Sequence, residues 1–147
     1  MSLAHAADRD LGDAILLSAY TGLRKGELLR LTKADVEDGC VVVRSGKSKT
    51  SERIIPVPRV ALPILKRLPI KMDANKLDKE WRKVRSAAGL DHVRFHDLRH
   101  TYGSWLAQSG ASGVIIRDAM GHSSLTVTSR YLHSAPAHVR AAVRKLK

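Results

Sequence analysis

Four short segments of the chain carry cationic and polar side chains where the pattern of a helix does not require them. Arginines occur within residues 21–27 and 96–100, lysines within 47–50, histidines within 96–100 and 121–124, and a tyrosine within 130–133. Planar guanidinium groups bind the nonbridging oxygens of a phosphate bidentately. A phenol, with an unperturbed pKa of about 10, is a weak nucleophile unless a neighbour accepts its proton and cations stabilise the phenolate. Together, these residue types are suited to attack on a phosphate ester.

The overall charge favours a polyanionic partner. The 147 residues include 26 Lys and Arg against 14 Asp and Glu, which gives a formal net charge of +12 and a pI of about 10.4. A positive potential of this size attracts any polyanion, and nucleic acid is the leading candidate. The two Trp, three Tyr and one Phe are too few and too scattered for the stacking platforms of single-strand binders. Double-stranded DNA is therefore the expected partner.

Helical patterning places these segments on a mainly helical domain. It predicts helices over about residues 8–20, 73–88, 96–108, 112–120 and 135–147, and a further helix, capped by Thr21, that carries Arg24 and Glu27 one turn apart. Residues 40–43 and 53–58 are predicted strands, joined into a hairpin by the basic stretch 44–51. We expect an α+β fold, predominantly helical, with a small antiparallel sheet.

In order and spacing, the four segments resemble the catalytic domain of the tyrosine recombinases, the phage integrase family. The resemblance runs from about residue 10 to residue 133. It rests on the three-residue step from His96 to Arg99 and on the nine-residue interval from His122 to Tyr131. It implies the family's catalytic-domain architecture and a reaction through a covalent 3′-phosphotyrosine bond to DNA, with neither ATP nor a metal cofactor.

The resemblance also implies roles for individual residues. Two arginines would hold the scissile phosphate, a tyrosine would attack it, and a lysine of the hairpin would protonate the leaving 5′ hydroxyl. The implied catalytic set is Arg24, Lys49, His96, Arg99, His122 and Tyr131. Glu27 would hold Arg24, and Lys25 and Lys47 are expected to bind DNA. Lys47 remains the alternative to Lys49 as the general acid.

Taken singly, most of these signals have a structural explanation. Arg24 and Glu27 could form only a helix surface pair worth about 0.3–0.5 kcal/mol. The hairpin lysines could be solubilising charges, and His122 could interact with the carbonyls that end a helix. The simultaneous match of all six residues in order favours the catalytic interpretation.

Two further expectations concern histidine and tyrosine. His100 lies one turn after His96, but no third ligand follows, so we expect no metal site and interpret His100 as a buried histidine near Tyr102 and Trp105. Tyr131 follows the Ser- and Thr-rich stretch 123–129, which predicts an exposed, mobile nucleophile.

We expect residues 1–147 to form a single catalytic domain without the N-terminal DNA-binding domain of the family. A full-length protein would assemble as a tetrameric synapse on DNA, and the isolated domain would be monomeric.

One cysteine and no long apolar run indicate a cytoplasmic protein, in the bacterial nucleoid or encoded by a phage, with no membrane contact. Site-specific recombination in the integration or excision of a prophage or mobile element is the expected function. A type IB topoisomerase-like activity and a DNA-binding regulator that keeps the fold are the alternatives.

Overall fold

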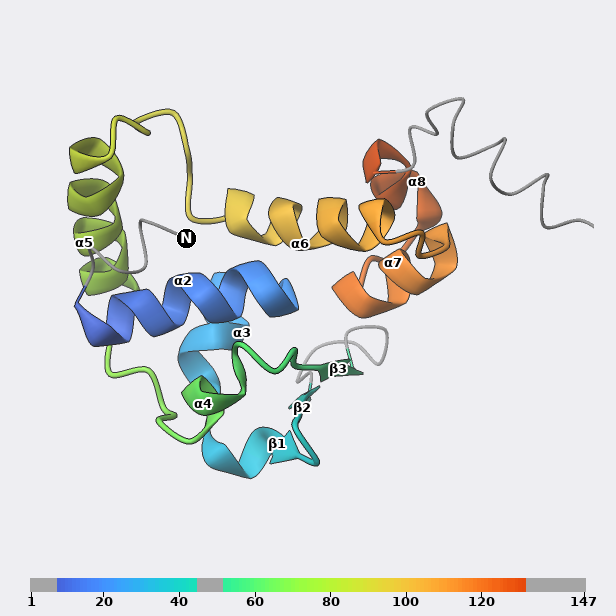
Figure 1. Ribbon diagram of the computed structural model, residues 1–147, viewed down its shortest axis with the longest axis horizontal. Coiled ribbons are helices and arrows are strands. Elements are labelled where there is room, and N and C mark those ends of the chain that lie inside the picture. Colours follow the sequence, from blue (N-terminus) through green and yellow to red (C-terminus); the bar gives the residue numbers. More distant parts are fainter. Residues whose placement is uncertain (1–7, 45–51, 132–147) are drawn as a thin grey trace, which may run out of the picture.

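The computed structural model describes residues 8–44 and 52–131. Helices dominate this part of the chain and a small antiparallel sheet lies at one side of them, which confirms the predicted fold class (Figure 1). The α-helices are α2 (Arg9–Thr21), α3 (Lys25–Arg30), α4 (Leu62–Leu65), α5 (Ala74–Ala87), α6 (Asp97–Gln108), α7 (Gly113–Met120) and α8 (Leu125–Thr128). Short 3₁₀ helices cover Lys33–Asp35 and Ser129–Tyr131. The hairpin tip and the predicted helix over residues 135–147 lie outside the described residues.

Side-chain caps fix where the main helices begin. The carboxylates of Asp8 and Asp73 accept hydrogen bonds from backbone N–H groups in the first turns of α2 and α5, and the Ser112 hydroxyl does the same for α7. The predicted cap at Thr21 is wrong. Thr21 is the buried last residue of α2 and donates its hydroxyl to the Leu17 carbonyl, while Arg24 is the N-cap residue of α3.

The sheet has the strand order β1 (Val36–Glu37), β2 (Cys40–Val43), β3 (Arg53–Pro56), and both pairings are antiparallel. Asp38 and Gly39 form the turn between β1 and β2, each with a positive φ, as a two-residue hairpin turn requires. Val41 pairs with Ile55, and both side chains are fully buried. The hairpin of β2 and β3 was predicted, whereas β1, with two residues, is too short to leave a periodic pattern.

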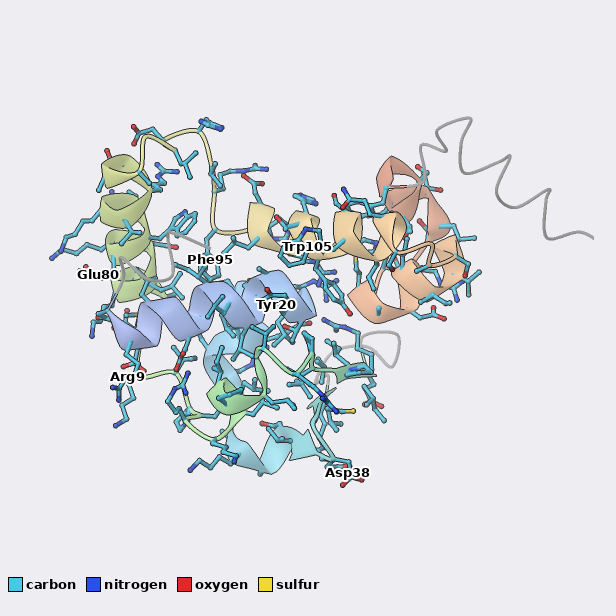
Figure 2. All side chains as sticks on the ribbon, in the orientation of Figure 1. Arg9, Tyr20, Asp38, Glu80, Phe95 and Trp105 are labelled. Carbon is cyan, nitrogen blue, oxygen red and sulfur yellow. The ribbon has the colours of Figure 1, made fainter. Side chains whose placement is uncertain are left out.

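Helix α2 lies at the centre of the fold, between α6 on one side and α3 with the sheet on the other (Figure 1). Its leucines Leu11 and Leu17 are buried, as are Leu28 of α3 and Leu77 of α5. Figure 2 shows Tyr20 and Trp105 close together where α2 meets α6, and their ring centroids lie 5.2 Å apart. This packing sets the end of α2 against the middle of α6.

The turn after α2 is fixed by Gly22. Its φ of 62° ends α2 in the left-handed conformation. A Cβ at this position would collide with the Tyr102 ring of α6, so the backbone approaches α6 as closely as glycine permits. The residues that follow, including Arg24, are thereby held next to α6.

Within residues 8–44 and 52–131, no helix combines the length and apolar character needed to cross a bilayer.

Candidate active site

Arg24 and Glu27 form the first pair of the site. Arg24 donates from Nη1 to Glu27 Oε1 at 2.9 Å and from Nη2 to the Gly121 carbonyl at 3.0 Å. Its backbone N–H donates to Glu27 Oε2 at 2.8 Å, so the carboxylate caps the helix that carries it. Glu27 thus accepts hydrogen bonds from both the side chain and the backbone of Arg24, the residue that it was expected to hold. Contact with Gly121 ties the pair to the end of α7.

Glu27 is held on its other side by Arg53, at the start of β3. The Arg53 guanidinium donates to both carboxylate oxygens, with Nη2 to Oε2 at 2.8 Å and Nη1 to Oε1 at 3.2 Å, and its Nε donates to the Ala119 carbonyl at 3.1 Å. The Arg53 side chain is only 5% exposed. Arg24 and Glu27 are thus part of a half-buried network that joins α3, β3 and α7, and not a simple surface pair.

Arg99 lies within the same group of charges. It is 3% exposed and donates to the carbonyls of Gly22 and Met120, which lie at the ends of α2 and α7. Burial and the positive charges of Arg24 and Arg53 lower its pKa to about 10, and Glu27 and Tyr131 act in the opposite direction. Arg99 stays cationic at neutral pH. Three guanidinium groups therefore interact with one carboxylate, which leaves an excess of positive charge for an anion.

The pKa of Glu27 provides a stability test of this network. Burial alone would raise it, but hydrogen bonds and charge from Arg53 and hydrogen bonds from Arg24 lower it from 4.5 to about 2. Because the folded protein favours the ionised carboxylate, Glu27 stabilises the fold at pH values above its ordinary pKa of 4.5. This contribution is lost as the pH falls from about 4.5 to about 2. At pH 7, Glu27→Gln should lower the free energy of unfolding by about 3 kcal/mol.

The measurement is urea unfolding of both proteins at pH 7 and again near pH 2, where we expect the difference to disappear. Glu80→Gln is a matched control, because Glu80 pairs with Lys83 on the surface of α5 and its loss should cost about 0.5 kcal/mol or less. A difference that persists unchanged at low pH would contradict the assigned ionisation of Glu27.

Tyr131 packs on α6 and is not the exposed side chain that the sequence predicted. It is partly buried at the end of the 3₁₀ helix, its hydroxyl lies 2.6 Å from His100 Nδ1, and its ring is stacked with that of His122. A Cβ at Gly103 would lie 2.8 Å from Tyr131 Cζ, so the phenol rests on α6 where a glycine leaves room. The Ser- and Thr-rich stretch before it forms α8 and the 3₁₀ helix, which position the tyrosine.

The remaining candidate histidines lie beside the tyrosine. The His122 Nδ1 is 3.0 Å from the hydroxyl of Thr128, a fully buried residue of α8. His96 is the N-cap residue of α6 and is exposed, and its ring forms a T-shaped contact with that of His100, with the ring centroids 5.2 Å apart. Although His96 is exposed, partial desolvation of its ring, together with the nearby charges of His100 and Arg99, lowers its pKa. This favours the neutral imidazole near neutral pH.

The structure therefore brings five predicted residues into one region, namely Arg24, Glu27, Arg99, His122 and Tyr131, with His96 at its edge. Lys47 and Lys49 lie outside the described residues. Lys25 forms an ion pair with Asp78 of α5, with Nζ 2.8 Å from Oδ2. His100 was interpreted as a buried histidine near Tyr102 and Trp105, but it is only partly buried and contacts His96 and Tyr131.

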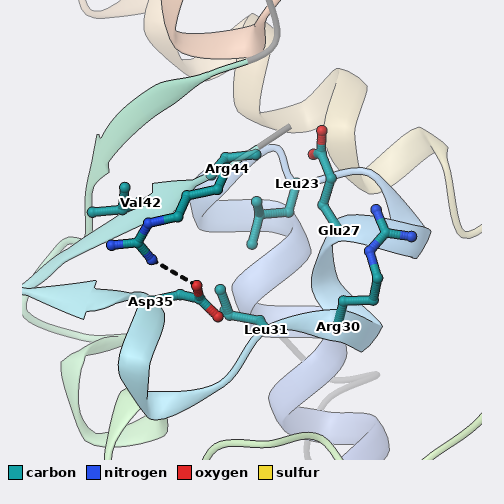
Figure 3. Close-up of a pocket in the computed structure, with 8 residues that line it drawn as sticks. Leu23, Glu27, Arg30, Leu31, Asp35, Val42 and Arg44 are labelled. Atoms are coloured by element: carbon teal, nitrogen blue, oxygen red, sulfur yellow. Dashed lines mark hydrogen bonds and ion pairs between the residues drawn. The ribbon is translucent and has the colours of Figure 1, made fainter. Parts of the chain in front are cut away.

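The strand that leads to the lysine segment is anchored beside this network. Figure 3 shows Arg44, which follows β2, reaching back to Asp35 across a pocket that is also lined by Glu27 and Arg30. Arg44 Nη1 lies 2.8 Å from Asp35 Oδ1, and Nη2 lies 2.8 Å from Glu37 Oε1. Arg44 and Glu27 thus line the same pocket.

Arg53, His100 and Gly103 are site residues that sequence reasoning missed. Arg53 resembles an ordinary first residue of an edge strand, and only its position directly after the basic stretch could have drawn attention to it. His100 follows Arg99 directly, and no local pattern distinguishes a contact with Tyr131 from core packing. For metal binding, the described residues contain no group of three or more His, Cys, Asp or Glu side chains arranged to hold an ion.

Comparisons with known proteins identify the family. The profile of the phage integrase family matches residues 69–138, which include Arg99, His122 and Tyr131. A tyrosine recombinase of Thermosipho africanus (strain TCF52B) is 32% identical over 151 residues, which cover 90% of this chain and 53% of that protein. The catalytic domain of the bacteriophage HP1 integrase has a TM-score of 0.78 at 26% identity, over 97% of this chain and 88% of that one. The chain belongs to the phage integrase family.

Within the phage integrase family, this chain corresponds to the catalytic domain. The Tn1549 transposon integrase, solved in complex with a circular intermediate DNA, shares the fold with a TM-score of 0.80 at 21% identity, over 99% of this chain and 63% of that one. The chain spans about half the length of the curated tyrosine recombinases that it matches.

Proposed function

We propose that this chain cleaves and rejoins double-stranded DNA through a covalent 3′-phosphotyrosine at Tyr131, as the catalytic domain of a site-specific recombinase. One observation carries the proposal: the cluster of Arg24, Arg53 and Arg99 around the single carboxylate of Glu27, with the phenol of Tyr131 in electrostatic reach of Arg99. An excess of guanidinium charge beside a tyrosine hydroxyl suits attack on a phosphodiester.

In the proposed reaction, Arg24 and Arg99 hold the nonbridging oxygens of the scissile phosphate. The Tyr131 Oη attacks phosphorus, the bond to the 5′ oxygen breaks, and Lys49 protonates the leaving oxygen, with Lys47 as its alternative. His96 would lie beside the phosphate. His122 lies beside the phenol, with its ring stacked with that of Tyr131. Arg53 acts through Glu27, because it holds the carboxylate that orients Arg24. Rejoining is the reverse, with a 5′ hydroxyl as the attacking group.

The names of the relatives support a role in recombination of mobile DNA. They include a tyrosine recombinase, a phage integrase and a transposon integrase solved with DNA. We propose double-stranded DNA as the partner and integration or excision of a prophage or mobile element as the setting. We further propose that residues 1–147 act as one catalytic domain, monomeric in isolation, and that the full-length protein forms a tetrameric synapse.

The test is a covalent trap. The chain is incubated with duplexes that carry a nick within randomised sequence, so that cleavage near the nick releases a short fragment and prevents rejoining. We expect a protein–DNA band that survives denaturing detergent and disappears on protease treatment. Binding without such a band would contradict the proposal and favour a DNA-binding regulator. Relaxation of a supercoiled plasmid with no exchange of strands between duplexes would favour the topoisomerase-like alternative.

A further inference from the structure

The hydroxyl of Tyr131 has a basic nitrogen at contact distance. His100 Nδ1 lies 2.6 Å from Tyr131 Oη, with the ring centroids 6.1 Å apart and the ring planes tilted by 41°. A separation this short is within the range of a strong hydrogen bond to a phenol. The two residues are 31 positions apart in sequence, so the fold, and not local chain geometry, brings them together.

Helix α6 positions this contact together with the phosphate-binding charge. Arg99, His100 and Gly103 occupy neighbouring turns of α6. Gly103 leaves room for the phenol, because a Cβ there would lie 2.8 Å from Tyr131 Cζ, the carbon that bears the hydroxyl. Arg99 is buried on the same helix and interacts electrostatically with Tyr131. One rigid helix therefore sets the distance between the phenol, its nitrogen neighbour and the guanidinium group.

The phenol must lose a proton when its oxygen bonds to phosphorus. A neutral imidazole whose Nδ1 accepts a hydrogen bond is a suitable acceptor, since histidine changes protonation state near neutral pH. The positive charge of Arg99, which interacts electrostatically with Tyr131, favours the phenolate. The developing negative charge on the phosphate then offsets the imidazolium that forms.

We propose that His100 is the general base of the reaction and takes the Tyr131 proton on Nδ1 as Oη attacks the phosphodiester. This inference rests on the proposed function. In the step, the Oη–P bond forms, the bond from phosphorus to the 5′ oxygen breaks, the phenol proton moves to His100, and the leaving oxygen takes a proton from the hairpin lysine. In rejoining, the 5′ oxygen bonds to phosphorus and gives its proton to the hairpin lysine, while the phosphotyrosine bond breaks and His100 returns the proton to Tyr131 Oη.

The test compares rates of adduct formation on the nicked duplexes. His100→Gln keeps a side chain that can hydrogen-bond the phenol but cannot carry its proton, and should form the adduct at least about 100-fold more slowly with unchanged DNA affinity. His100→Asn gives a second, smaller replacement that should show the same loss. His92→Gln is the matched control, since His92 is an exposed histidine in the turn between α5 and α6, and should react at the normal rate.

A more acidic nucleophile separates a base from a merely positioning residue. Difluorotyrosine placed at position 131 loses its proton without assistance, so it should restore His100→Gln by about 10-fold or more. Unchanged adduct formation in His100→Gln, or a loss that difluorotyrosine does not restore, would overturn the inference while the proposed function stands. Absence of an adduct from the unmodified chain would overturn both.

Discussion

Tyr131→Phe should abolish the covalent protein–DNA adduct and leave duplex binding intact. Phenylalanine keeps the ring that packs on Gly103 and stacks with His122, and it loses only the hydroxyl that contacts His100. The variant should therefore fold, with a stability loss of about 1 kcal/mol or less from the missing hydrogen bond. Denaturing gels measure the adduct, and fluorescence anisotropy with a labelled duplex measures binding.

Tyr20→Phe is the control for this experiment. Tyr20 is a phenol on α2 that packs against Trp105 and takes no part in the proposed reaction. It should form the adduct at the normal rate. An adduct that survives in Tyr131→Phe, or one that disappears in Tyr20→Phe, would remove Tyr131 from the role of nucleophile.

Arg99→Ala should have the second largest effect, and it should affect both catalysis and folding. Loss of the buried guanidinium removes charge that stabilises the transition state, so adduct formation should fall by about 10²–10³-fold. It also leaves the Gly22 and Met120 carbonyls without their donor, which should cost about 1–3 kcal/mol of stability. Single-turnover cleavage and urea unfolding measure the two effects separately.

Arg85→Ala is the control that separates the effect on cleavage from the effect on stability. Arg85 of α5 donates to the Val93 carbonyl at 2.8 Å, so it too is an arginine that holds a backbone carbonyl, but α5 lies at the opposite end of the fold from α7 and α8 (Figure 1). This variant should lose some stability and cleave normally. Near-normal cleavage by folded Arg99→Ala would contradict a role for Arg99 at the phosphate.

Much of the fold could be predicted because its signals are local. The caps Asp8, Asp73 and Ser112, and the left-handed Gly121 that ends α7, lie within one turn of the helix ends that they define. The β-branched run of β2 needs only the period of a strand. Thr21 was misassigned because its hydroxyl bonds back to Leu17 within α2, and a threonine has the same appearance in sequence whether it ends one helix or caps the next.

The site was only partly predictable, because its missing contacts join distant segments. Arg53 reaches Glu27 across 26 positions, and His100 reaches Tyr131 across 31. Neither contact leaves a periodic or spacing signal near either residue. The expected exposure of Tyr131 was wrong for a related reason: the Ser- and Thr-rich stretch 123–129 predicted an exposed, mobile side chain, whereas the tyrosine packs on Gly103 of α6.

The most direct measurement is to locate the DNA on the protein. The trapped adduct is digested with nuclease and trypsin, and the modified peptide is sequenced by mass spectrometry. Trypsin cuts after Arg130 and Arg140, so the nucleophile should lie on the peptide of residues 131–140. We predict a 3′-linked nucleotide on the Tyr131 oxygen. A nucleotide on any other residue, or a 5′ linkage, would contradict a 3′-phosphotyrosine mechanism at this site.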